Sequence, residues 1–270
     1  MKSILFNAHS DEGHSRRLDL ALDLARALDA HLTVLNAMPL EVGVSGDAYG
    51  AAFAVMIPVW REEAKKLREQ TEADLANEGV SWDWVDKAGP ASSALLERSP
   101  LADLIVIGER EPDFEAKMPS YTVGELALGA DCPVLVLPEE TERLDLTKPA
   151  LVAWDGSAEA SHALRAAVPL LRQCEQVYLV SVKEKKDAGF DLPRVSGADY
   201  LSRHGIACEL VEIEADAKGI AAALRNAAQV RDCGLMVMGA YGRMRITERI
   251  FGGVTREMLT DVKVPLLLRH

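Results

Sequence analysis

The chain repeats one pattern twice, and this repeat limits the folds that it can adopt. Short apolar runs alternate with longer stretches of helical periodicity, first over residues 1–138 and again over residues 149–270. Strands that alternate with helices are typical of parallel sheets whose crossovers are helical. The run PVLVLP closes the first copy, and VPLLL closes the second. The sequence therefore predicts two tandem α/β domains, each a doubly wound, five-stranded parallel sheet.

The elements of each copy follow from periodicity and from turn residues. Strands of the first copy are expected at 4–8, 32–35, 80–85, 104–107 and 133–138, and helices at 18–28, 59–77, 90–96 and 125–128. Residues 43–56 are expected to form a loop and a weak helix start. Strands of the second copy are expected at 151–154, 177–182, 208–213, 235–238 and 265–268, with helices at 160–171, within 191–204, at 220–230 and from 254. The charged segment 139–148 is expected to be a linker.

A glycine-rich segment follows the apolar run 235–238 and leads into a helical pattern. Its glycines and arginines are Gly239, Gly242, Arg243, Arg245, Arg249, Gly252 and Gly253. Glycine lets backbone N–H groups approach an anion, and a helix N-terminus adds unpaired donors and a positive dipole end. The segment therefore predicts a phosphate-binding loop. Close packing of a strand on a helix would use glycine in the same way, so the glycines alone leave both interpretations open.

The spacing of these glycines, G-x2-G-x9-G, is neither a dinucleotide fingerprint nor a Walker A loop. It resembles the ATP-binding motif of universal stress proteins, and the segments AWDGS at 153–157 and LVSV at 179–182 resemble that family too. The resemblance covers the whole chain and is closest to the bacterial tandem type, with the specific motifs in the second copy. It implies a stress-response regulatory protein with a site for an adenine nucleotide (ATP, ADP or AMP) in that copy.

The resemblance also implies the residues of the site. Asp155 and the main chain at Val182 would meet the adenine, and the glycine loop would hold the ribose and phosphates. The complete set is Asp155, Val182, Gly239, Gly242, Arg243, Gly252, Gly253, Val254 and Thr255. The family has Ser or Thr where this chain has Gly253. A hydrogen bond to a charged group contributes about 1.5–3 kcal/mol, so the missing hydroxyl predicts affinity lower by roughly one or two tenfold steps. Thr255 could offer a hydroxyl nearby.

Three residues at the end of the first strand of the second copy, or just after it, have alternative roles. Asp155 could cap the following helix instead of meeting a ligand. Ser157 is expected to be an N-cap and not a nucleophile. Trp154 is expected in the core, with a place in the wall of a ligand pocket as the alternative.

The first copy lacks the features of this site. His9 stands where the acid would be, and no second glycine follows Gly108 at the motif's spacing. The charged residues after Gly108 are Glu109, Arg110, Glu111, Asp113 and Glu115. Gly124 is separated from Gly108 by 15 residues. Because the local charge is mostly negative and repels phosphate, we predict that the first copy binds no triphosphate.

Composition narrows the class of protein. The net charge of −12 argues against nucleic acid or an anionic membrane as the main partner. No run approaches the ~20 apolar residues of a membrane span, and the start does not fit a secretory signal, so we expect a cytoplasmic protein without membrane insertion. The four cysteines and six histidines show no metal-ligand spacing, so free thiols and no metal site are expected.

Three functions follow from these observations. The first is a nucleotide-binding regulatory module with little or no catalysis. The second is a slow ATPase or phosphotransferase, for which the sequence names no base, and the need for magnesium is open. The third is an interaction scaffold that binds no nucleotide. The resemblance implies that residues 133–137 and 264–268 pair within one chain as a pseudo-dimer. Association into a homodimer, the protein partners and a partner-binding role for the helix at 59–77 stay open.

Overall fold

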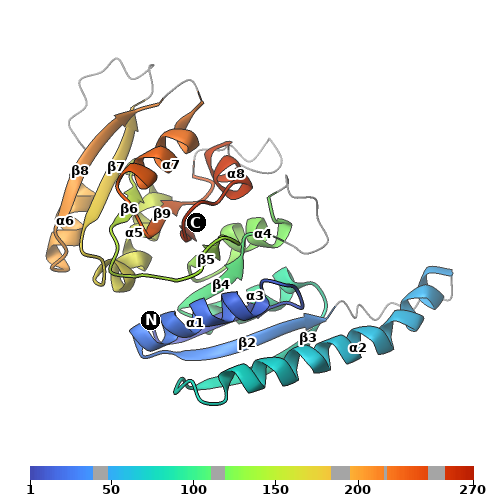
Figure 1. The fold of residues 1–270 in the computed structure, drawn as a ribbon. Coiled ribbons are helices and arrows are strands. Elements are labelled where there is room, and N and C mark those ends of the chain that lie inside the picture. The colour runs from blue at the N-terminus through green and yellow to red at the C-terminus, as the bar shows by residue number, and fades with distance from the viewer. Residues whose placement is uncertain (39–47, 111–118, 184–194, 216–217, 243–252) are drawn as a thin grey trace. The chain divides into compact units, whose positions relative to one another are not determined.

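The computed structural model describes residues 1–38, 48–110, 119–183, 195–215, 218–242 and 253–270 (Figure 1). Its contacts divide the chain into two compact units, Met1–Ile107 and Gly108–His270. In these ranges, no helix is both long enough and apolar enough to cross a bilayer.

The first unit is a parallel sheet covered by helices. Its strands are β1 (Ser3–Ala8), β2 (His31–Met38), β3 (Trp82–Ala88) and β4 (Leu104–Gly108), in the order β3-β2-β1-β4. Its helices are α1 (His14–Leu28), α2 (Ala48–Leu75) and α3 (Ala91–Arg98), followed by the 3-10 turn η1 (Ser99–Leu101). The central strands β1 and β4 are buried along almost their whole length. Continuous apolar strands of this kind need cover on both faces, which the crossover helices supply.

The second unit contains the second sequence copy and the end of the first. Its helices are α4 (Tyr121–Gly129), α5 (Ala158–Leu171), α6 (Ser196–Arg203), α7 (Ile220–Val230) and α8 (Gly253–Thr260). Its strands are β5 (Val134–Leu137), β6 (Ala150–Ala153), β7 (Val177–Lys183), β8 (Cys208–Glu214), β9 (Leu235–Gly239) and β10 (Leu266–Arg269). Strands β6 to β10 form the expected five-stranded parallel sheet, in the order β8-β7-β6-β9-β10. The chain order reverses between β6 and β9, which places a ligand crevice at the carboxyl ends of those strands.

Strand β5 joins this sheet in the opposite direction. It pairs antiparallel with β10, with Leu135 opposite Leu267. Both side chains are almost completely buried. The pairing confirms the expectation that the closing strands of the two copies meet within one chain as an intramolecular pseudo-dimer. It also explains why the compact units divide before β5, whereas the sequence copies divide after it. The domain bounds 1–138 and 149–270, with a linker at 139–148, stay a prediction about the sequence copies.

The largest departure from expectation is in α2. The sequence predicts a loop and a weak helix start over 43–56 and a regular helix only from 59. Helix α2 instead begins at Ala48 and continues through Pro58, whereas residues 43–47 lie outside the described residues. Proline removes one helical hydrogen bond and usually ends a helix, and the apolar stretch before it has no helical periodicity. The glycines and small apolar residues of this stretch were what favoured a loop. In Figure 1 the first turns of α2 extend past the ends of β2 and β3.

Helix α4 begins earlier than expected, at Tyr121. Ser120 caps it, because its hydroxyl accepts a hydrogen bond from the N–H of Val123 over 3.1 Å. The four cysteines are free, as expected. Burial raises the pKa of the Cys174 and Cys233 thiols to about 11, so both stay protonated at neutral pH.

The β5–β10 ladder gives a stability prediction. Leu267→Ala removes a fully buried side chain and should lower the free energy of unfolding by about 2–5 kcal/mol. Leu101→Ala is the matched control, because Leu101 is 91% exposed and its truncation should change stability by less than about 0.5 kcal/mol. Denaturant titration measures both. Equal effects of the two substitutions would contradict the assignment of Leu267 to the core.

Candidate functional site

A cavity of about 350 Å³ lies at the carboxyl ends of β6, β7 and β9 in the second unit. The predicted site residues that line it are Asp155, Val182, Gly239, Gly242, Gly253, Val254 and Thr255. The structure therefore gathers residues that are up to 100 positions apart in sequence, from 155 to 255. Arg243 and Gly252, together with Arg245 and Arg249, lie outside the described residues.

The turn after β6 settles the capping alternatives. Ser157 is the N-cap of α5, and its hydroxyl accepts a hydrogen bond from the N–H of Ala160 over 3.2 Å. Asp155 accepts a hydrogen bond from the N–H of Ser157 over 2.9 Å and lines the cavity. Gly156 between them has a φ of 75°, which favours glycine. Asp155 thus shapes the turn before the helix and does not cap it.

Trp154 fills both roles that the sequence left open. Its side chain is buried, and it also lines the cavity. A Cβ atom at Gly197 would lie 2.9 Å from the indole, so α6 packs directly on the ring. The hydroxyl of Ser181 donates a hydrogen bond to the Trp154 carbonyl over 2.7 Å. The hydrogen bond fixes the main chain at Trp154, and the packing of α6 fixes the indole in the cavity wall.

The rest of that wall is largely apolar. Aliphatic and thioether side chains come from β7, α7 and β9. They are Val180, Val182, Ile220, Leu224 and Met238. An apolar wall with a few polar groups at one end is typical of small-molecule sites and suits a flat aromatic base.

Three motif glycines have different surroundings. A Cβ atom at Gly239 would lie 2.6 Å from the backbone nitrogen of Ala160, so β9 approaches α5 closely there. A Cβ atom at Gly242 would lie 2.6 Å from the carboxyl oxygen Oε2 of Glu159. At Gly253, no atom of the described residues lies within 4 Å of such a Cβ. Close packing therefore accounts for Gly239, whereas Gly253 has open space around it.

The loop after β9 is held to α8. The N–H of Tyr241 donates a hydrogen bond to the hydroxyl of Thr255 over 3.2 Å, and Thr255 is buried. Tyr241 has a φ of 60°, an uncommon conformation for a non-glycine residue. Burial raises the pKa of its phenol to about 12. The Thr255 oxygen thus holds the loop in place by accepting this hydrogen bond. Its hydroxyl proton is what Thr255 could still donate to a ligand.

Among the polar lining residues, sequence reasoning gave no role to Glu159 and Tyr241. Tyr241 lies between two motif glycines, which was a usable signal. Glu159 is in the first turn of α5. Along the described part of the cavity lining, the charged side chains are the two acids Asp155 and Glu159. Across the described ranges, no group of three or more His, Cys, Asp or Glu side chains is arranged to hold a metal ion.

The fold and this cavity define a tandem, doubly wound α/β protein with a crevice at its topological switch point. The model of the universal stress protein family matches residues 1–138 and 147–270. The chain therefore belongs to the universal stress protein family. Comparison with curated proteins finds no match.

Two solved structures have the same fold along the whole chain. A universal stress protein from Archaeoglobus fulgidus is 17% identical, with a TM-score of 0.76, and the alignment covers 98% of this chain and 97% of that one. A putative universal stress protein from Pseudomonas aeruginosa is 19% identical, with a TM-score of 0.61 and coverage of 100% and 93%. At these identities the likeness concerns the fold alone.

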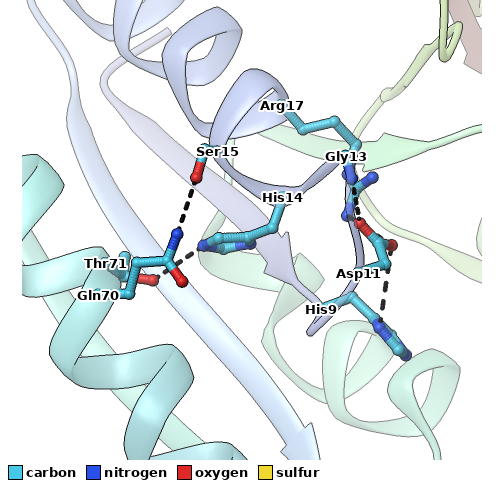
Figure 2. A network of polar contacts seen from close by, with 8 residues as sticks. All are labelled: His9, Asp11, Gly13, His14, Ser15, Arg17, Gln70 and Thr71. Carbon is cyan, nitrogen blue, oxygen red and sulfur yellow. Dashed lines mark hydrogen bonds and ion pairs between the residues drawn. The ribbon is translucent and has the colours of Figure 1, made fainter.

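In the first unit, an ion pair lies at the turn after β1, as Figure 2 shows. Both carboxyl oxygens of Asp11 accept hydrogen bonds from the Arg17 guanidinium, over 2.8 and 2.9 Å. Asp11 also accepts the N–H of Gly13 over 2.9 Å. The guanidinium packs over Gly13, since a Cβ atom there would lie 2.5 Å from Nη1 of Arg17. Arg17 is buried, so the charge of Asp11 is balanced within the protein.

A second contact in Figure 2 joins α1 to α2. The ring nitrogen Nε2 of His14 lies 2.9 Å from the Thr71 hydroxyl, which donates its own proton to the Leu67 carbonyl over 2.7 Å. The His14 ring therefore donates at Nε2 and is neutral. Burial, with help from the nearby Arg17 charge, lowers the pKa of His14 from 6.5 to about 4.

His14 predicts a pH dependence of stability. Between pH 6.5 and about 4 the unfolded chain takes up a proton at His14 that the folded chain does not. The stability that depends on neutral His14 should therefore be fully present above pH 6.5. Below that pH the free energy of unfolding should fall, by up to about 3 kcal/mol at pH 4. His14→Gln should flatten this part of the profile, whereas His162→Gln, at an exposed histidine, should not. Denaturant titration between pH 4 and 7 measures the slopes. Parallel profiles for wild type and His14→Gln would contradict the prediction.

The surroundings of Gly239 and Gly253 predict opposite effects of alanine substitution on stability. Gly239→Ala places a methyl group 2.6 Å from backbone atoms of α5 and should lower the melting temperature of the second unit by several degrees. Gly253→Ala meets open space at the start of α8 and should be neutral or stabilising by up to about 1 kcal/mol. Thermal unfolding compares the two. Equal losses would show that the space at Gly253 is not available to a side chain.

Proposed function

We propose that the second unit binds an adenine nucleotide in this cavity and acts as a stress-response regulatory module with little or no catalysis. The observation that carries the proposal is the convergence of the motif residues from β6, β7, β9 and α8 on one cavity at the switch point of the sheet. Family membership supplies the nature of the ligand.

Each part of the cavity has a role in this proposal. The adenine packs against Trp154 and the aliphatic wall, where its flat apolar faces are removed from water. At the edge of the base, the Asp155 carboxylate accepts a hydrogen bond, and the main chain at Val182 forms hydrogen bonds as well. The ribose and phosphates lie towards Gly242 and the N-terminus of α8, whose first residue is Gly253. The unpaired N–H groups of that helix end suit an anion.

The proposal assigns no catalytic residue. Tyr241, with a pKa of about 12, holds its proton too firmly to act as a base at neutral pH. A slow ATPase or phosphotransferase is the alternative that a hydrolysis assay tests, and a scaffold without a nucleotide is the alternative that a binding assay tests. ADP release over hours would favour the ATPase. Purified protein that neither carries nor binds adenine nucleotide would favour the scaffold.

We also propose a single nucleotide site for each chain. In the first unit, Arg17 already neutralises Asp11 and lies over Gly13 at the turn after β1. Releasing this buried ion pair for a ligand would leave an arginine without its carboxylate, which is unfavourable. This adds to the acidic sequence after Gly108 as a reason to expect no triphosphate there.

Nucleotide titration by calorimetry tests the proposal. We expect one equivalent of adenine nucleotide for each chain, and weaker binding by about tenfold or more for Asp155→Ala, because hydrogen bonds to a charged group are lost. Gly242→Glu should abolish binding by filling the site. Gly253→Ser should strengthen nucleotide binding by about tenfold, because the open space accepts the hydroxyl that the family motif has there.

The control is Glu175→Ala, which removes an exposed acid just before β7, at the opposite end of that strand from the cavity. It should leave binding unchanged. Mass spectrometry of small molecules released from the purified protein identifies any ligand carried from the cell. Two equivalents for each chain would overturn the single-site proposal, and unchanged affinity in Asp155→Ala would place the nucleotide elsewhere.

A further inference from the structure

Glu159 lies in the candidate site, although no motif includes it. It is in the first turn of α5, two residues after the cap Ser157. Its side chain reaches across to the loop after β9, so that Oε2 would lie 2.6 Å from a Cβ atom on Gly242. Glycine at 242 is thus what gives the carboxylate room. Glu159 and Asp155 line the same cavity.

The Glu159 carboxylate forms no ion pair and no side-chain hydrogen bond with the residues that the structure describes. This differs from Asp11 in the first unit, whose charge Arg17 balances. A carboxylate in the first turn of a helix is stabilised by the helix dipole. The positive end of α5 therefore already faces an anion that belongs to the protein.

The position of Glu159 affects how the site would accommodate the phosphates of a ligand. A nucleotide whose base lies at Trp154 and Asp155 would direct its phosphates towards Gly242, where Glu159 lies. Like charges a few ångströms apart in a partly enclosed cavity repel much more strongly than they do in water. The repulsion grows with the number of negative charges that the ligand carries, and it is absent for an uncharged nucleoside.

We propose that Glu159 makes this site discriminate against phosphate charge, so that adenosine binds in preference to free ATP. The inference rests on the proposed adenine site and specifies which ligands that site accepts. Glu159 is a specificity-determining residue here and takes no part in any reaction. The same carboxylate makes triphosphate binding depend on a divalent cation that accompanies the ligand and reduces its charge.

Isothermal titration with adenosine, AMP and ATP in EDTA tests the inference. For the wild type we expect affinity to fall in that order. Glu159→Gln keeps the shape of the side chain and removes its charge, so it should raise the affinity for ATP by about tenfold or more. Its affinity for adenosine should change by less than about twofold, since adenosine carries no charge to repel. Adding Mg²⁺ should strengthen ATP binding more in the wild type than in Glu159→Gln.

The control is Glu175→Gln, which removes the same charge from an exposed site in the same unit and should leave all three affinities unchanged. If Glu159→Gln changes adenosine and ATP binding equally, or leaves ATP binding unchanged, the inference is wrong while the adenine site stands. If no variant binds any of the three ligands, the proposed function itself fails. Thermal unfolding of Glu159→Gln shows whether the variant keeps its fold.

Discussion

The close approach of β9 to the N-terminus of α5 is the contact on which the candidate site depends. At Gly239 the strand comes so near the helix backbone that a side chain would clash with it. This approach places the loop after β9 beside the first turn of α5, and it places the turn at Asp155 beside both. The cavity follows from the same geometry, because its floor is the sheet and its sides are these two connections. A glycine that allows close packing thus also shapes the candidate site.

Much of the fold could be predicted from the sequence, because the alternation of strands and helices is regular and occurs twice. The later turns of α2 were predicted as a helix at 59–77. Its start at Ala48 was not, because the residues there are small and apolar, include glycine and lack helical periodicity. The contacts of the later turns, such as Thr71 with His14, are not visible in local sequence either. The pairing of β5 with β10 came from family resemblance. Two buried strands of similar composition do not specify their partner or direction by themselves.

The residues of the candidate site that belong to the sequence motif could be predicted. Asp155, Val182 and the glycines were predicted because strand ends and glycine spacing leave a clear pattern, and the structure brings the described ones together. Glu159 was missed because an acid in a first helical turn is common and has an ordinary explanation in the helix dipole. The role proposed for it rests on its closeness to Gly242, 83 positions later, which only the folded chain reveals.

The two copies surround the acidic side chain at the turn after their first strand in different ways. In each, a strand ends at a tight turn with an acidic side chain before a helix whose N-terminus attracts anions. The first copy balances Asp11 with the buried Arg17, which stabilises the turn and leaves it no free charge for recognition. In the second copy Asp155 and Glu159 line a cavity, and Glu159 forms no ion pair with the residues that the structure describes. Departures from local charge balance are expected at functional sites, so the contrast favours the cavity of the second unit as the candidate site.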